Sequence, residues 1–198
     1  MPRRYSMEVR QEESDRRRER LLDAGAAVLA ESGADGLTME AVAVRADTAT
    51  RTLYNHFSSR DDLIKAVFRR QLVDLRANLV SVQPEGGSTV ERLGSFISTL
   101  FEYYRREGAS LTALLDHRVP KEVGDQVTEM RTWRRSQLQG ILRPARSELT
   151  MSLANATAIA FVLTNRTSYT ALADESGLST TRAAALTLTA LERAVFCS

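Results

Sequence analysis

The chain has 198 residues, of which 43% are hydrophobic and 26% charged, and its formal net charge is +2. A chain of this length and apolar content can bury a core, which excludes a disordered segment. Its single cysteine, Cys197, excludes a disulfide framework within the chain and fits a reducing compartment.

The composition favours helices over strands. Glycine (10 residues) and proline (4) are scarce, and the long stretches of Ala, Leu, Arg and Glu are good helix formers. Arginine, which binds phosphate and guanine through planar bidentate contacts, provides all but two of the cations, Lys65 and Lys121. Genomic base composition can also enrich arginine over lysine without any functional cause, so this alternative to a role in nucleic-acid binding stays open. With no apolar run of about 18 residues and no secretory signal, we expect a cytoplasmic protein without a membrane partner.

The N-terminal residues predict an arm followed by a helix. Residues 1–13 are polar with mixed charges, and we expect a loose arm there. Ser14 or Asp15 can cap a first helix that runs to Ser32, and Gly33 is well placed to end it.

A short second helix is predicted to begin at Thr38, whose hydroxyl can cap it. Ala41, Val42 and Val44 are expected to point inward. The helix breaks at residues 46–49, where Asp47 tolerates left-handed backbone angles.

A third helix over residues 50–56 and a fourth over residues 60–82 follow, the fourth capped by residues 58–59. Residues 83–88 form the clearest linker of the chain. We therefore expect a DNA-binding domain over residues 14–70, with the fourth helix leading into a helical domain over residues 84–198.

The C-terminal part predicts more helices, with Gly108 ending the first of them and Ser179 capping the last. Their expected ranges are 89–107, 111–115, 121–142, 150–173 and 180–195. The chain is therefore predicted to have an all-α fold of about nine helices: an N-terminal helix-turn-helix domain of three helices and a C-terminal helical domain.

Two short helices joined by a four-residue turn are typical of a helix-turn-helix, whose second helix enters the DNA major groove. The helix predicted over residues 50–56 takes this second place in the motif. Leu53 and Phe57 are four residues apart and are expected to face the core. The outward side chains carry hydrogen-bonding groups: Thr50, Arg51, Thr52, Tyr54, Asn55 and His56.

Residues 21–68 resemble the DNA-binding domain of the TetR family of repressors. The resemblance is carried by Gly33, by Thr38-Met39-Glu40-Ala41-Val42-Ala43, by Thr52-Leu53-Tyr54-Asn55-His56-Phe57 and by Arg60-Asp61-Asp62-Leu63. The turn departs from the pattern, because Asp47-Thr48-Ala49 replaces the usual Gly-Val-Ser and removes the serine cap, for which Thr48 or Thr50 could substitute. Arg51 stands where the family commonly has glycine.

The resemblance implies roles for these side chains. Thr38, Tyr54, His56 and Arg60 are expected to contact phosphates, which fix the register on DNA. The candidates for contacts with base edges are Thr50, Arg51, Thr52 and Asn55, since arginine pairs with guanine and asparagine with adenine. Structural alternatives stay open: Tyr54 as a core aromatic, His56 as a structural histidine and Asn55 as a solvated side chain.

The resemblance also implies that the C-terminal helices form a homodimer interface and a ligand pocket. For that pocket we expect a small, mostly apolar effector. The last two predicted helices are rich in Ala, Thr and Leu, which allows close helix packing. Candidate pocket residues are Phe96, Phe101, Tyr103, Tyr104, Trp133, Phe161, Asn165 and Tyr169. Aromatic residues at helical spacing are more often plain core, and that alternative stays open. Asn165 is the most suggestive because a buried amide needs a partner.

We therefore expect a homodimeric transcriptional repressor that binds a palindromic operator in double-stranded DNA and needs no cofactor or metal. An enzyme is disfavoured for three reasons. The two histidines, His56 and His117, accompany no evident nucleophile motif, and the sequence contains neither a glycine-rich phosphate loop nor the spacing of metal ligands. The unusual turn leaves open a third class, a helical interaction module that has lost DNA binding.

Overall fold

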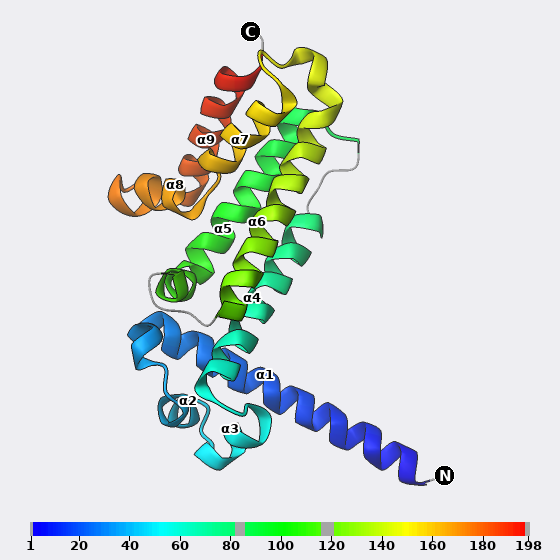
Figure 1. Cartoon of the computed structure of the whole chain (residues 1–198), viewed down its shortest axis with the longest axis vertical. Helices are drawn as coiled ribbons and strands as arrows, with labels where there is room; N and C mark the ends of the chain where they lie inside the picture. The colour runs from blue at the N-terminus through cyan, green and yellow to red at the C-terminus, as the bar shows by residue number, and fades with distance from the viewer. Residues whose placement is uncertain (1, 82–85, 116–120, 197–198) are drawn as a thin grey trace. The chain divides into compact units, whose positions relative to one another are not determined.

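The computed structural model describes residues 2–81, 86–115 and 121–196, and over these residues it contains nine α-helices and no strand longer than one isolated bridge (Figure 1). The predicted all-α fold is confirmed. The chain folds as two units, Met1–Gln71 with Ala109–Gly124 (the first unit) and Leu72–Gly108 with Asp125–Ser198 (the second unit). Residues 83–85 of the predicted linker, His117 and Cys197 lie outside the described residues.

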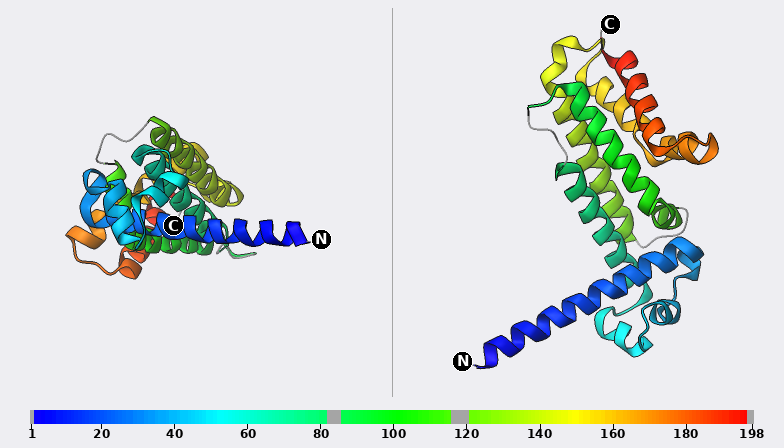
Figure 2. Two further views of the ribbon diagram at one scale, coloured as in Figure 1. Left: turned by 90° about the horizontal axis from the view of Figure 1, so that it is seen from below. Right: turned by 180° about the vertical axis from the view of Figure 1, so that it is seen from behind.

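The first unit begins with a longer helix than expected. Helix α1 spans Pro2–Gly36, so the prediction of a loose arm over residues 1–13 is wrong from Pro2 onward (Figure 2). The reason is local: the segment is made of good helix formers, and side chains one turn apart support it. Gln11 donates to Asp15 over 3.0 Å, and Arg16 lies 3.7 Å from Glu12.

The first unit also contains three further helices or parts of helices: α2 (Met39–Arg45), α3 (Thr50–His56) and the first half of α4 (Arg60–Ser81). Gly33 has φ 69° and interrupts α1 where its end was predicted, because only glycine adopts this conformation without strain. The expected inward position of Val44 is wrong, since its side chain is 82% exposed, whereas Ala43 is buried. The core is mostly apolar and includes Leu29, Leu37, Val42, Leu53, Phe57, Leu63 and Val67.

The second unit contains the rest of α4 together with most of α5 (Thr89–Leu115) and α6 (Lys121–Leu142), which run side by side (Figure 1). Gly108 does not end α5, and the separate helix expected over residues 111–115 is part of it. A β-carbon at position 108 would lie 2.6 Å from the Cζ atom of Arg166. Gly108 therefore makes room for a neighbouring side chain, and the helix continues through it.

The chain then turns through the 3₁₀ segment η1 (Arg143–Glu148) into α7 (Leu153–Leu163). The single helix expected over residues 150–173 is wrong, because Asn165 interrupts it and caps a new helix, α8 (Arg166–Thr170). A π-helical turn, η2 (Ala171–Glu175), follows α8. The last helix, α9 (Thr180–Val195), has the predicted bounds and its predicted Ser179 cap, and it packs against α7.

Candidate nucleic-acid interface

The two short helices α2 and α3 are joined by a tight turn. Thr38 caps α2, because its Oγ1 accepts a hydrogen bond of 3.0 Å from the Ala41 amide. Asp47 adopts the left-handed conformation with φ 49°, which aspartate tolerates better than most residues other than glycine. The amide of Thr48 donates to the Ala43 carbonyl over 3.0 Å, which closes the turn.

Helix α3 is anchored by two buried side chains. Leu53 and Phe57 are 0% and 1% exposed, as expected from their spacing, and they turn the opposite face of the helix outward. The helix has no side-chain cap, since the preceding residue is Ala49. The expectation that Thr48 or Thr50 would replace the missing serine cap is therefore wrong.

The outward face of α3 carries most of the predicted DNA contacts. Tyr54 is 52% exposed, so the alternative of a core aromatic does not apply to it. Exposure sorts the predicted residues into two groups. Thr38, Arg51, Tyr54 and Asn55 are exposed, whereas Thr50, Thr52, His56 and Arg60 are half-buried. The helix thus presents a phenol, a guanidinium and an amide, which are groups that hydrogen-bond phosphates and base edges.

Arg60 is held differently from the other predicted phosphate contacts. Its guanidinium donates to the Leu37 carbonyl over 2.6 Å and to the Ala34 carbonyl, both just after the break at Gly33. Carbonyls at the end of a helix have no partner within that helix. Arg60 therefore fastens the start of α4 to the corner between α1 and α2, a role that its sequence position did not predict.

The start of α4 is fixed by the predicted caps. Ser59 Oγ accepts from the Asp62 amide over 3.2 Å, and the Asp62 carboxylate accepts from the Ser58 amide over 3.0 Å. Such reciprocal bonds satisfy amides that the helix itself leaves unpaired.

Two arginines of α1 are neighbours of α3 that sequence reasoning missed. The Arg18 guanidinium lies 5.1 Å from the ring centroid of Phe57. Burial lowers the pKa of His56 below its ordinary value, and the positive charges of Arg17 and Arg18 lower it further. The signal for these neighbours is the run Arg16-Arg17-Arg18, but their distance along the chain from His56 gives no reason to pair them.

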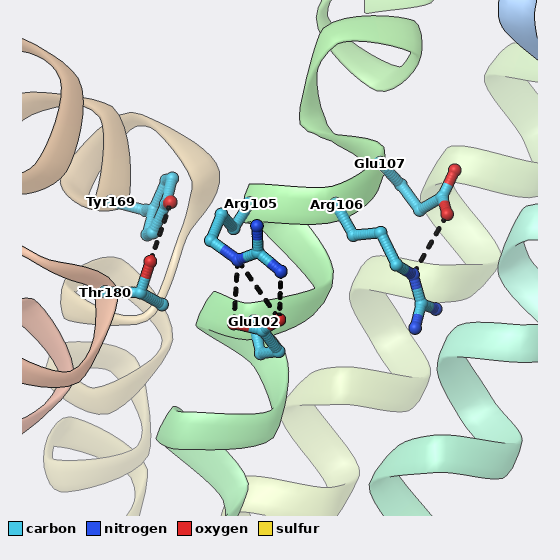
Figure 3. A network of polar contacts seen from close by, with 6 residues as sticks. All are labelled: Glu102, Arg105, Arg106, Glu107, Tyr169 and Thr180. Carbon is cyan, nitrogen blue, oxygen red and sulfur yellow. Dashed lines mark hydrogen bonds and ion pairs between the residues drawn. The ribbon is translucent and has the colours of Figure 1, made fainter.

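The predicted pocket residues lie at several places in the second unit, and four of them form one cluster. Phe101, Tyr104 and Tyr169 form an aromatic cluster with ring centroids 5.2–6.3 Å apart. Tyr103 joins it through Tyr104 at 6.5 Å, and the hydroxyl of Tyr169 lies 3.3 Å from that of Thr180 (Figure 3). Phe96 lies on α5, as do Phe101, Tyr103 and Tyr104, and it is fully buried.

The other candidates do not join this cluster through ring contacts. Trp133 is half-buried and lies beside Arg76, whose guanidinium is 5.5 Å from the indole. Phe161 lies beside Arg134. The amide of Asn165 already has the partner that its position calls for, because its Oδ1 accepts from the Ser168 amide over 2.7 Å. Its polarity is thus explained by helix capping.

Two further properties of the described residues bear on site chemistry. No group of three or more His, Cys, Asp or Glu residues among them could hold a metal ion. None of the described helices is long and apolar enough to cross a membrane.

The comparison with known families centres on the segment just described. Residues 21–67 match the family model "Bacterial regulatory proteins, tetR family". The chain carries a TetR-family DNA-binding domain. The match begins in α1 and ends in α4, so it contains the capped α2, the turn and α3 with its two buried anchors.

Relatives agree with this assignment. The chain is 33% identical over 93 residues to the HTH-type transcriptional repressor KstR of Mycolicibacterium smegmatis, a match that covers 47% of this chain and 46% of the relative. The chain thus matches about half the length of this curated TetR-type relative. Matched relatives of this kind are transcriptional regulators.

Solved structures share the fold over most of the chain. A transcriptional regulator from Rhodococcus sp. RHA1 aligns with TM-score 0.76 and 20% identity, covering 91% of this chain and 98% of that one. The regulator FadR of Bacillus subtilis, solved with stearoyl-CoA, aligns with TM-score 0.72 and 18% identity over 87% and 96% of the two chains. At these identities the likeness concerns the fold, which includes the second unit as well as the first.

Proposed function

We propose that this protein is a sequence-specific transcriptional repressor of the TetR type, which binds a palindromic operator as a homodimer and leaves it when a small, mostly apolar ligand binds. The observation that carries the proposal is α3, a short helix with its apolar anchors buried and Arg51, Tyr54 and Asn55 exposed in one stretch. A helix with only a structural role has no reason to expose this set of donors and acceptors.

Within α3, the proposed division of labour follows chemistry. Tyr54, His56 and the cap of α2 at Thr38 contact phosphates and set the register, which carries no sequence information. Arg51 and Asn55, with Thr50 and Thr52, contact base edges. Arg60 contributes through the corner that it holds, and its remaining guanidinium surface is available to a phosphate.

The homodimer is supported by the apolar surface that one chain leaves uncovered. Helix α7 is apolar around most of its circumference, yet Val162 is 57% exposed, and Leu186 on α9 is 48% exposed. A second copy that packs its own α7 and α9 there would cover both in an isologous interface. A palindromic operator has two half-sites in successive major grooves, which lie about 34 Å apart. It therefore requires two recognition helices, one from each copy of the chain.

The proposal is tested with DNA from the region upstream of the protein's own gene. We expect fluorescence anisotropy to give tight binding to one palindromic site, with an affinity that falls steeply as salt is raised, because phosphate contacts release counterions. Sedimentation velocity on the same samples gives the oligomeric state of the free and bound protein. Affinity for the best site that does not exceed affinity for random DNA contradicts sequence-specific repression.

The base contact proposed for Arg51 is tested by Arg51→Ala. We expect it to weaken binding to the preferred site by about 1–3 kcal/mol and to relax specificity at one base position. Arg69→Ala is a matched control, because Arg69 is an exposed arginine of α4 outside the helix-turn-helix, and we expect its effect to be small. An equal loss on all sequences assigns Arg51 to a phosphate.

A further inference from the structure

Helix α6 carries a buried arginine with no acidic partner. Arg134 is only 8% exposed, and its guanidinium donates to the Tyr104 hydroxyl over 2.7 Å. Its two other bonds, to the carbonyls of Thr164 and Phe161, are both long at 3.4 Å. The Nε atom is buried without any hydrogen-bond partner. All of these partners are neutral, so the charge is not compensated.

An uncompensated buried cation is unfavourable, because neutral dipoles replace only part of its hydration. Several carboxylates of α5 and α6 are paired elsewhere. Glu102 pairs with Arg105 and Glu107 with Arg106 (Figure 3), and Glu129 pairs with Arg76. Over the part of the chain that the structure describes, Arg134 thus has hydrogen bonds but no carboxylate.

A second cation stands beside the first. The guanidinium carbons of Arg134 and Arg135 lie 4.1 and 4.7 Å from the centroid of the same ring, that of Phe161. Arg135 is exposed and Phe161 half-buried, so this pair of charges reaches from the interior to the surface. Among described residues Arg135 has no ion pair either. Two guanidinium groups that share one ring and no acid form a site of concentrated positive charge.

The neighbouring hydroxyl suits the same chemistry. Burial raises the pKa of Tyr104, although the charge of Arg134 opposes the shift, and the phenol is neutral at ordinary pH. Its oxygen accepts from Arg134, and its proton is available to a further acceptor. Tyr104 also belongs to the aromatic cluster with Phe101 and Tyr169, so polar donors and apolar rings adjoin one another here.

We propose that Arg134 and Arg135 bind the acidic group, a carboxylate or a phosphate, of an amphiphilic effector whose apolar part lies against Phe161. Arg135 would meet the anion at the surface, and Arg134 would form charge-assisted hydrogen bonds with it, including one from the unpartnered Nε. The inference rests on the proposed ligand response and narrows its ligand class from mostly apolar molecules to apolar acids.

The test is a direct titration of the full chain with three probes below their micelle concentrations: dodecanoate, dodecyl phosphate and the neutral dodecanol. Trp133, the only tryptophan of the chain, is adjacent to Arg134 in sequence and reports binding by its fluorescence. Calorimetry gives an independent affinity. We expect both acids to bind more tightly than the alcohol. Whichever of the two acids has the higher affinity identifies the preferred head group, a carboxylate or a phosphate.

Variants then assign the acid preference to the two arginines. We expect Arg135→Met and Arg134→Met each to weaken binding of the preferred acid at least tenfold and to leave dodecanol binding unchanged. Arg135 is exposed, so its variant keeps the proposal testable if Arg134→Met fails to fold. Arg146→Met, at an exposed arginine of η1, is the matched control and is expected to bind the acid like the wild type.

The outcomes separate the two proposals. Acids that bind no better than dodecanol, or equally well to Arg135→Met and the wild type, overturn the anion site, whatever the DNA-binding result. Acids that bind through the arginines and release operator DNA support both the site and the ligand response. Acids that bind through the arginines without releasing DNA support the site and contradict the ligand response.

Discussion

The two short helices of the first unit have the same length but are held in place by different means. Helix α2 begins at Thr38, whose hydroxyl caps it, whereas α3 begins after Ala49 and has no side-chain cap. Helix α3 instead relies on Leu53 and Phe57, both fully buried. A helix of seven residues is not stable alone, so each needs one of these supports.

This contrast shows how a recognition helix can be fixed without using its polar groups. In α2 the hydroxyl oxygen of Thr38 accepts a hydrogen bond from the helix itself. In α3 the buried anchors provide the support, and Arg51, Tyr54 and Asn55 are exposed. Three changes test the distinction between a capped and an anchored helix, and a fourth tests the charge environment of α3.

The largest effect is expected from removing an anchor of α3. Leu53→Ala deletes a fully buried side chain, and we expect it to lower the free energy of unfolding of the first unit by about 2–5 kcal/mol, because both apolar burial and packing are lost. Urea unfolding followed by circular dichroism measures this change. Val44→Ala, at an exposed apolar residue of α2, is the control, and a similar loss there would remove the contrast.

The next effect concerns the cap of α2. Thr38→Ala removes the acceptor for the Ala41 amide, and we expect it to cost about 1 kcal/mol of stability. Amide hydrogen exchange in α2 measures the loss locally. Thr38→Ser keeps the hydroxyl and is expected to restore protection; a Ser variant as weak as the Ala variant would show that the cap is not the cause.

A smaller gain is expected from giving α3 the cap that it lacks. Ala49→Ser places a hydroxyl at the N-cap position, and we expect it to stabilise α3 by about 0.5–1 kcal/mol. Exchange rates of the α3 amides report the gain. Ala49→Val adds bulk without an acceptor, so protection in that variant equal to the serine variant would argue against capping.

The smallest effect is a pH dependence from His56. Its pKa is lowered by burial and by Arg17 and Arg18, so the unfolded chain binds more protons than the folded protein just below the ordinary value of 6.5. The free energy of unfolding therefore falls as pH drops through about 6.5 and levels off below the folded pKa. His56→Gln is expected to flatten this part of the curve of stability against pH, and an unchanged curve would contradict the assignment.

Much of the first unit is predictable from sequence, because its signals are local. A capping threonine, a glycine with positive φ and a pair of apolar residues four apart each act within one turn, and α3 has the predicted bounds. The carbonyl contacts of Arg60 could not be foreseen, since they join residues more than twenty positions apart.

The second unit is less predictable because its irregularities depend on neighbours from other helices. Asn165 stands in an apolar stretch that suggests a buried amide in search of a ligand, whereas it caps α8. Gly108 suggests a helix end, since nothing along the sequence announces the arginine beside it. The buried charge of Arg134 is equally hidden, because the sequence of α6 is that of an ordinary charged amphipathic helix.

Variation among related chains is constrained where Gly108 faces Arg166. The Arg166 guanidinium lies over the bare backbone of α5, within reach of the Tyr104 carbonyl at 3.4 Å and of the Asp174 carboxylate at 3.6 Å. Any side chain at position 108 would occupy that space. Positions 108 and 166 are therefore expected to covary, with glycine opposite arginine and larger residues opposite shorter ones.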